Sequence, residues 1–125
     1  DQVVKLIDFG FAQSFVPGEA SFSEVCGTPI YMCPEVVSEA YDEKCDVWSC
    51  GIVMHELICG TTPFNAVSAQ MTLWIAATRS ADLDEPEWDG VSPAGKALLR
   101  AMLTKKPGER LSAGEALHHE WFRPL

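Results

Sequence analysis

The sequence predicts a mainly α-helical fold with one short β segment at the N-terminus. Apolar residues recur at helical spacing within residues 46–59, 68–78 and 93–103, and Pro, Ser and Gly stand where those segments begin or end. A short β-branched and apolar run at residues 3–7 predicts the strand. The chain has 125 residues, which suits one domain.

A long loop is expected between the strand and the first helical segment. Gly, Pro, Ser and Thr dominate residues 11–34, and a loop of this length inside a compact domain is usually functional or disordered. Residues 34–38 then predict a short helical turn with Pro34 at its start.

The segment at residues 46–59 predicts a helix that stops at Gly60. It is apolar nearly all round, which is typical of a helix in the middle of a larger protein. Residues 68–78 predict the next, amphipathic helix.

Capping residues define the two remaining helices. Ser92 is expected to cap a helix whose first position is Pro93. Ser112 and Glu115 have the spacing of a capping box, which opens a last helix that ends near Trp121.

The balance of charge restricts the partners. Lys and Arg number 9 against 18 Asp and Glu, so the formal net charge is −9. An acidic surface argues against binding nucleic acid or an anionic membrane, and it favours basic peptides. Simple solubility explains the charge equally well. No apolar run reaches the roughly 20 residues needed to span a bilayer.

The five cysteines predict free thiols. Their number is odd and no Cys-x-x-Cys pair occurs, which argues against a disulfide framework or a zinc ribbon. Most stand among apolar residues, as small buried thiols do. Free thiols indicate a reducing compartment, so we expect a cytoplasmic, intracellular protein.

Several short blocks follow one another in a fixed order. They are Asp8-Phe9-Gly10, GTPIYMCPE at residues 27–35, DVWSCG at 46–51, Pro63-Phe64, Pro107, Arg110 and LHHEWF at 117–122. Any single block is a weak signal, but the ordered series resembles the eukaryotic protein kinases of the serine/threonine type. The stretch YDEKCDVW at residues 41–48, with Trp88 and Trp121, is similar to the calmodulin- and calcium-dependent group.

The resemblance implies a domain organisation. Residues 1–125 would form part of a protein kinase domain, whose whole fold is α+β. Residues 8–35 would be its activation segment and residues 36–125 its helical C-terminal lobe. The N-terminal lobe and the catalytic loop lie upstream in the family and are absent from this sequence.

The implied activity is transfer of the γ-phosphate of ATP to Ser or Thr of protein substrates, with ATP and Mg²⁺ as cofactors. Asp8 would be the catalytic residue that holds the metal, because Mg²⁺ prefers oxygen ligands. In the same nucleotide-binding motif, Phe9 would pack inward and Gly10 would let the backbone reverse. Alternatively, Asp8 caps a turn after a strand.

The resemblance also places the substrate. Thr28 and Pro29 would lie beside the hydroxyl-bearing substrate residue, while Ile30 and Tyr31 would line the pocket for the residue after it. Glu56 would read an arginine upstream of the phosphorylated site, which fits the acidic net charge. Alternatively, Thr28 bonds its own backbone and Glu56 fills an exposed polar gap on a buried helix.

Regulation is expected in the same segment. Glu24 stands where many relatives carry a phosphorylated Thr, so a permanent carboxylate would order the loop with little phosphorylation. A solvated Glu in a mobile loop is the alternative. Ser21 and Ser23 remain candidate phosphorylation sites.

Three residues have implied structural roles. Glu35 and Arg110 would form a buried ion pair that ties the activation segment to the helical lobe. Asp46 resembles the residue that accepts backbone hydrogen bonds from the catalytic loop.

Competing interpretations of the whole protein remain. Calcium-sensing or calmodulin-like regulation would come from segments outside this chain. A pseudokinase or scaffold would keep the helical lobe as a binding module, although it would not need Asp8. A truncated gene model without a function of its own is the third interpretation, and the isolated fragment is expected to be inactive.

Overall fold

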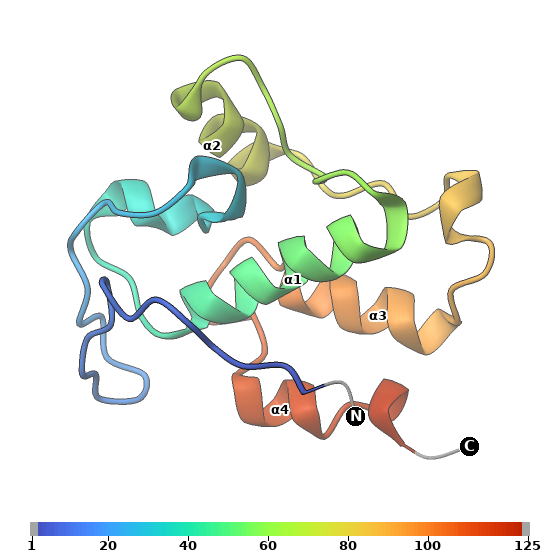
Figure 1. Ribbon diagram of the computed structural model, residues 1–125. Helices are drawn as coiled ribbons and strands as arrows, with labels where there is room; N and C mark the ends of the chain where they lie inside the picture. The colour runs from blue at the N-terminus through green and yellow to red at the C-terminus, as the bar shows by residue number, and fades with distance from the viewer. Residues whose placement is uncertain (1–2, 124–125) are drawn as a thin grey trace.

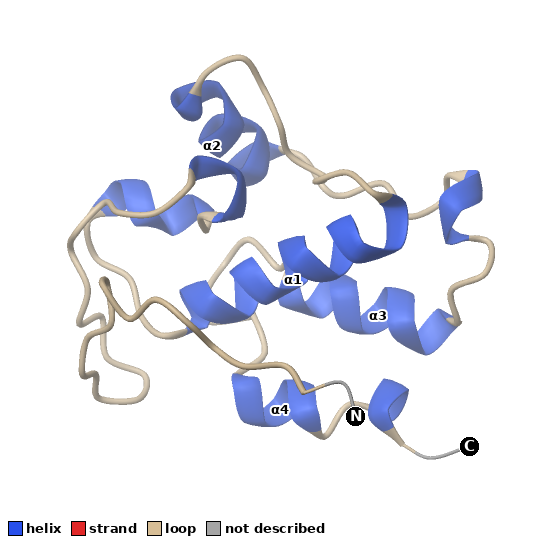
Figure 2. Cartoon of the chain, viewed as in Figure 1, coloured by secondary structure: helices blue, strands red, loops and turns tan. Residues whose placement is uncertain are grey.

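The computed structural model describes residues 3–123, and helices dominate it (Figures 1 and 2). The α-helices are α1 (Lys44–Cys59), α2 (Ala69–Thr78), α3 (Pro93–Met102) and α4 (Ala113–Leu117). Short 3₁₀ turns are η1 (Pro29–Tyr31), η2 (Pro34–Ser38), η3 (Pro86–Trp88) and η4 (Glu120–Phe122). The mainly helical fold class is therefore confirmed.

Helix α1 runs through the middle of the molecule, and α3 packs along it (Figure 1). The two helices approach closely at Gly51, where an added Cβ would lie 2.9 Å from Leu103 Cδ2 and 3.1 Å from Met102 Cβ. Helix α2 contacts η1 and η2, so it supports the segment that follows the long loop.

The predicted helix boundaries are confirmed at the positions where a capping residue forms. The hydroxyl of Ser68 accepts a hydrogen bond from Met71 N–H, and that of Ser92 accepts one from Gly95 N–H. Ser112 and Glu115 form the reciprocal capping box. Gly60 ends α1 at φ 76°, a left-handed conformation that favours glycine.

Other boundaries differ from prediction. Helix α1 begins at Lys44, two residues before the predicted start, because its first turn closes before the apolar pattern begins. The last helix ends at Leu117 rather than near Trp121. There His119 Nδ1 accepts the Trp121 N–H and starts the separate turn η4.

The predicted strand at residues 3–7 is wrong for this chain. These residues are exposed and form no strand, and the bridge between Phe22 and Tyr41 is the β pairing found across residues 3–123. A strand requires a neighbouring strand to satisfy its N–H and C=O groups, and none of the described residues supplies one here.

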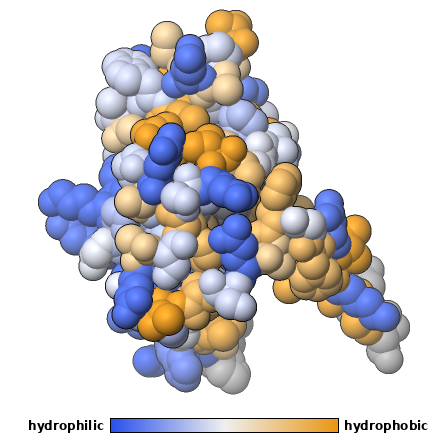
Figure 3. Space-filling model, turned by 90° about the vertical axis from the view of Figure 1, so that its left-hand side faces the viewer, coloured by the Kyte–Doolittle hydropathy of each residue, from blue (hydrophilic) through white to orange (hydrophobic). Residues whose placement is uncertain are grey.

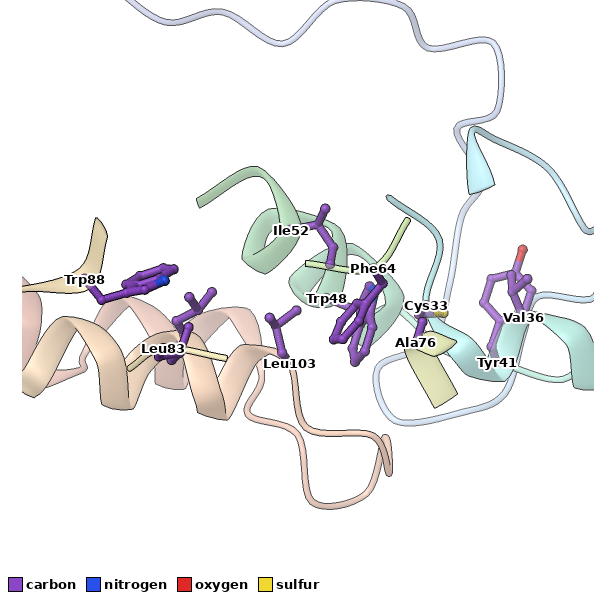
Figure 4. Packing of buried hydrophobic residues seen from close by; sticks show 11 residues of the cluster. Cys33, Val36, Tyr41, Trp48, Ile52, Phe64, Ala76, Leu83, Trp88 and Leu103 are labelled. Carbon is purple, nitrogen blue, oxygen red and sulfur yellow. The ribbon is translucent and has the colours of Figure 1, made fainter. Parts of the chain in front are cut away.

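The core is built around Trp48, whose ring stacks on Phe64 at a centroid distance of 5.7 Å (Figure 4). Ile52, Leu99 and Leu103 pack in the same cluster. Lys105 reaches this cluster, with Nζ lying 4.2 Å from the Phe64 ring centroid and 4.8 Å from that of Trp48. The buried Lys105 Nζ has no hydrogen-bond partner within residues 3–123.

The surface also carries much apolar area, seen as orange patches on the face in Figure 3. At the N-terminal end of the described chain, Val4 is 95% exposed and Phe9 71% exposed. On α1, Leu57 is 81% exposed. No helix within residues 3–123 is long and apolar enough to cross a membrane.

The thiols are more accessible than the sequence led us to expect. Cys33 is buried, whereas Cys26, Cys45 and Cys59 are half-buried and Cys50 is exposed. The helix that carries three of these residues leaves one face uncovered, so apolar neighbours in sequence do not bury every thiol.

Candidate functional site

A groove of about 390 Å³ lies between the long loop and the first turns of α1. The sequence-predicted residues Glu24, Thr28, Tyr31 and Asp46 line it, together with Cys33 and Ser49. Residues far apart in the chain therefore meet on one surface. Asp8 and Glu56 are not part of this lining.

The loop is fastened to the body of the protein around Tyr41. Phe22 and Tyr41 exchange two backbone hydrogen bonds of 3.1 Å, and the Tyr41 hydroxyl donates to the Glu24 carbonyl at 2.5 Å. The Glu43 carboxylate accepts the Gly18 N–H at 3.2 Å. Burial raises the pKa of Tyr41 to about 12, so its hydroxyl stays protonated as a donor. No pattern in the sequence indicates this role of Tyr41.

The segment Thr28–Tyr31 is held by α1 at two points. Ser49 donates its hydroxyl to the Tyr31 carbonyl at 2.8 Å, and the Tyr31 hydroxyl donates to Glu56 Oε2 at 2.8 Å. The hydrogen bond to Glu56 raises the pKa of Tyr31. Two predicted substrate-binding residues thus contact each other directly. Thr28 is exposed and makes no side-chain cap bond, while Pro29 and Ile30 are half-buried.

Asp8 adopts a left-handed conformation with φ 63°, and its Oδ1 accepts the Gly10 N–H at 3.2 Å. Asp8 is therefore the residue of this motif with a positive φ, whereas Gly10 lies within the turn that the Ala12 N–H closes onto the Phe9 carbonyl at 3.1 Å. Phe9 does not pack inward, because no described residue covers its ring and it is 71% exposed. The expectation that Phe9 packs inward is wrong in this chain, whereas the role expected of Gly10 stays a prediction.

Asp8 can serve as a metal ligand, since its carboxylate is exposed. Within residues 3–123 no group of three His, Cys, Asp or Glu side chains is placed to hold a metal ion. A single exposed carboxylate such as that of Asp8 fits Mg²⁺, because this ion is commonly held by one or two carboxylates together with substrate phosphates.

Glu35 and Arg110 form the expected ion pair. Arg110 Nη1 and Nη2 donate to the two Glu35 oxygens at 2.5 and 2.9 Å, and the arginine side chain is fully buried. The guanidinium also donates to the carbonyls of Thr104, Lys44 and Lys105. The paired geometry fixes η2, and with it the end of the loop, to the helical body.

Asp46 lies exposed in the first turn of α1, near the positive end of the helix. Within the described chain, Asp46 Oδ1 accepts a hydrogen bond from the Cys45 thiol at 3.7 Å. The carboxylate is therefore accessible to backbone donors from another segment, although the role predicted for it stays a prediction.

The three predicted regulatory residues are exposed. Ser21 donates its hydroxyl to the Glu19 carbonyl at 3.1 Å, whereas Glu24 is held through its backbone carbonyl and not its carboxylate. The geometry is compatible with both interpretations of Glu24.

The profile of the protein kinase domain family matches residues 1–122. The chain belongs to the protein kinase domain family. The kinase-like arrangement predicted from the ordered motifs is thereby confirmed at the level of the family.

The curated relatives of this kinase-domain chain point to one group. It is 39% identical over 123 residues to calcium-dependent protein kinase 27 of Oryza sativa subsp. japonica, covering 98% of this chain and 20% of the relative. It is 39% identical over 120 residues to calcium-dependent protein kinase 8 of Arabidopsis thaliana, covering 96% and 22%. Calcium-dependent protein kinase 3 of Plasmodium yoelii yoelii is 35% identical over 123 residues, covering 98% and 23%. The chain spans about a fifth of the length of these relatives.

Proposed function

We propose that the protein carrying this chain is a serine/threonine protein kinase and that the chain supplies its metal ligand and its substrate-binding face. The observation that carries the proposal is the placement of Thr28–Tyr31 along a groove, fixed by α1 through Ser49 and Glu56. Family membership and the similarity to calcium-dependent protein kinases support the same assignment.

Each residue has a proposed task. Asp8 holds Mg²⁺ with its exposed carboxylate. The bound metal neutralises charge on the phosphates of ATP, where the reaction depends on positioning and electrostatics. Thr28 and Pro29 position the substrate Ser or Thr, and Ile30 and Tyr31 contact the residue after it. Asp46 receives backbone N–H groups of a catalytic loop supplied by the rest of the kinase domain.

The proposed substrates are proteins with basic residues near the phosphorylated Ser or Thr. Glu56 supplies a carboxylate that accepts from Tyr31, a residue of the groove, and the net charge of −9 attracts cationic peptides to the whole surface. We further propose intracellular action, which the free thiols favour, and calcium-dependent control by segments outside this chain.

The control of activation is also a proposal. Glu24 replaces a phosphorylated residue with a permanent charge, and Ser21 and Ser23 are the candidate phosphorylation sites. Residues 1–125 alone are expected to transfer no phosphate, because phosphoryl transfer also requires a catalytic base, a phosphate-binding lysine and a glycine-rich loop.

Replacement of Asp8 tests the proposal. In the full-length protein, Asp8→Asn should lower the rate of phosphate transfer from ATP to a basic Ser peptide by about 100-fold or more, because a metal ligand stabilises the transition state by several kcal/mol. The exposed Asp89→Asn is the matched control and should keep full activity. A wild-type protein that transfers no phosphate would favour the scaffold interpretation instead.

A further inference from the structure

We propose that Glu43 is a positioning residue whose carboxylate fastens the tip of the long loop, at Gly18, to the start of α1. We call this contact the loop latch. The latch itself does not depend on the proposed kinase function, whereas its effect on peptide binding rests on that function. The inference follows from the turn at the loop tip, the partner of Gly18 and the groove beside the loop.

The tip of the loop is a type II turn. The segment Val16-Pro17-Gly18-Glu19 closes with the Glu19 N–H donating to the Val16 carbonyl at 3.1 Å. Pro17 occupies the second position and Gly18 the third, where its φ of 78° is the conformation that this turn type requires. Because the hydrogen bond of the turn uses Val16 and Glu19, the Gly18 N–H is left to donate to a partner outside the turn.

That partner is the Glu43 carboxylate, 25 residues further along the chain, whose two oxygens lie 3.2 and 3.3 Å from the Gly18 nitrogen. Glu43 directly precedes α1, and its side chain makes no capping hydrogen bond to that helix. The carboxylate therefore has no role in starting α1 and is available to the loop, which lies beside this end of the helix (Figure 1).

Packing does not hold the tip in place of the hydrogen bond. A Cβ at Gly18 would meet no heavy atom within 4 Å apart from those of its chain neighbours. The side chain of Val16 is 54% exposed and that of Phe15 is 48% exposed. A hydrogen bond to an ionised acceptor is stronger than one between neutral groups, so the carboxylate is the main restraint on the tip.

A second set of contacts holds the loop closer to the body of the protein. Phe22 and Tyr41 exchange backbone hydrogen bonds, and their ring centroids are 5.5 Å apart. The Phe15 ring follows at 6.3 Å from that of Phe22. Since Tyr41 is buried and Phe22 half-buried, loss of the latch should free the tip while this inner set of contacts stays formed.

The groove takes lining residues from both segments that the latch joins. Phe15 and Phe22 line it from the loop, and Glu43 lines it from the start of α1. Thr28 and Tyr31, which are proposed to bind substrate, line the same groove. A loop that is free at its tip would give the groove a less ordered wall, so we expect the latch to strengthen peptide binding.

Hydrogen exchange of the purified full-length protein, resolved to single amides by mass spectrometry, tests the latch. In Glu43→Ala the protection factor of the Gly18 amide should fall about fivefold or more, because a hydrogen bond to a charged group is lost. The amides of Phe22 and Tyr41 should keep their protection. Glu19→Ala is the matched control, since it removes the same charge from an exposed residue of the turn and leaves the latch intact.

Gly18→Ala examines the same contact from the loop side. It keeps the N–H but disfavours the positive φ, so protection at residue 18 should fall as in Glu43→Ala. Equal protection of Gly18 in wild type and Glu43→Ala, or an equal loss in Glu19→Ala, would show that Glu43 does not hold the tip. A loss of protection that extends to Tyr41 would mean that Glu43 stabilises the whole fold instead.

Peptide kinetics measure the consequence for the proposed function. The KM of the full-length protein for a basic Ser peptide should rise about threefold or more in Glu43→Ala relative to Glu19→Ala, with kcat little changed. An unchanged KM in a variant that has lost the latch would refute the effect on peptide binding. A wild-type protein that transfers no phosphate would overturn the proposed function, while the exchange measurement would still decide the latch.

Discussion

Lys105 places an ammonium group against the rings of Trp48 and Phe64, where Nζ is buried without a hydrogen-bond partner among the described residues. Burial, with Arg110 nearby, lowers the pKa of Lys105 to about 8. The favourable cation–π contact is thus opposed by loss of hydration. The sequence gives no sign of this, because Lys105 and Lys106 look alike there and only their surroundings separate them.

The lowered pKa of Lys105 predicts that the free energy of unfolding rises with pH. Below about pH 8 the residue is charged in both states, and the folded state bears the cost of burying the charge. Between about pH 8 and the ordinary value of 10.5 the folded protein has lost the proton while the unfolded chain keeps it, so the free energy of unfolding increases. Lys105→Met should remove this increase and raise the free energy of unfolding at pH 7.

Urea denaturation across this pH range measures the effect, and Lys106→Met is the exposed control. All other side chains are shared, so the comparison is between the two variants. Equal pH dependence in Lys105→Met and Lys106→Met would contradict the prediction.

The Glu56 carboxylate accepts a hydrogen bond from the Tyr31 hydroxyl, and it is also proposed to bind a substrate arginine. Glu56→Gln keeps an oxygen that accepts from Tyr31 but removes the charge, so it separates the two roles. We expect the KM of the full-length protein for an Arg-containing peptide to rise about tenfold or more, with kcat little changed, because a charged hydrogen bond contributes about 1.5–3 kcal/mol.

A neutral peptide and the Tyr31→Phe variant are the controls for Glu56. The KM for the neutral peptide should not change in Glu56→Gln. Tyr31→Phe leaves the carboxylate intact, so discrimination in favour of the Arg-containing peptide should persist. Equal changes in KM for both peptides would show that Glu56 has only a structural role.

At the scale of the elements, the sequence predicts features that depend on neighbouring residues, such as helix caps, better than features that depend on a distant segment, such as a strand. Ser68, Ser92 and the Ser112–Glu115 box could be predicted because a cap bonds within its own turn. The strand at residues 3–7 was not formed, because a strand depends on a partner elsewhere. The ion pair of Glu35 and Arg110 was accessible only through the family resemblance, and Ser49 and Tyr41 were missed.

Gly51 illustrates an element contact that no pattern in the sequence indicates. A glycine inside a helix ordinarily lowers stability relative to alanine by roughly 0.5–1 kcal/mol. Here, however, a Cβ would lie 2.9 Å from Leu103 Cδ2 and 3.1 Å from Met102 Cβ, so the buried Leu103 side chain or α3 itself would have to shift. Gly51→Ala should therefore destabilise the protein by about 1–3 kcal/mol through overpacking.

The neighbouring Cys50→Ala is a matched control for Gly51→Ala, because Cys50 is exposed on the same helix. It should change the free energy of unfolding by less than about 0.5 kcal/mol, as most surface substitutions do. A stabilised Gly51→Ala protein would show that the two helices do not pack as closely as described.

At the scale of the whole molecule, one buried ion pair joins the loop to the helical body. Glu35→Gln should lower the free energy of unfolding by about 3–5 kcal/mol, because the buried Arg110 loses the charge that compensates its own. Peptide phosphorylation should fall with it, since the groove segment Thr28–Tyr31 is continuous with η2. Urea denaturation and peptide assays measure the two effects.

Glu109→Gln provides the control for Glu35→Gln. This substitution breaks an exposed ion pair, in which the side chain of Lys106 is 76% exposed and that of Glu109 is 64% exposed. The free energy of unfolding should therefore fall by no more than about 1 kcal/mol. Similar losses in the two variants would mean that burial does not distinguish the two pairs.

The same ion pair has a consequence for the synthesis of the protein. Glu35 and Arg110 are 75 residues apart, so at about 5–20 residues per second the carboxylate is made roughly 4–15 s before its guanidinium partner. Throughout that interval the end of the loop lacks this ion pair, although α1 has already been translated. The peptide groove can therefore be completed only after Arg110 has been made and docks, when its five donors are satisfied together.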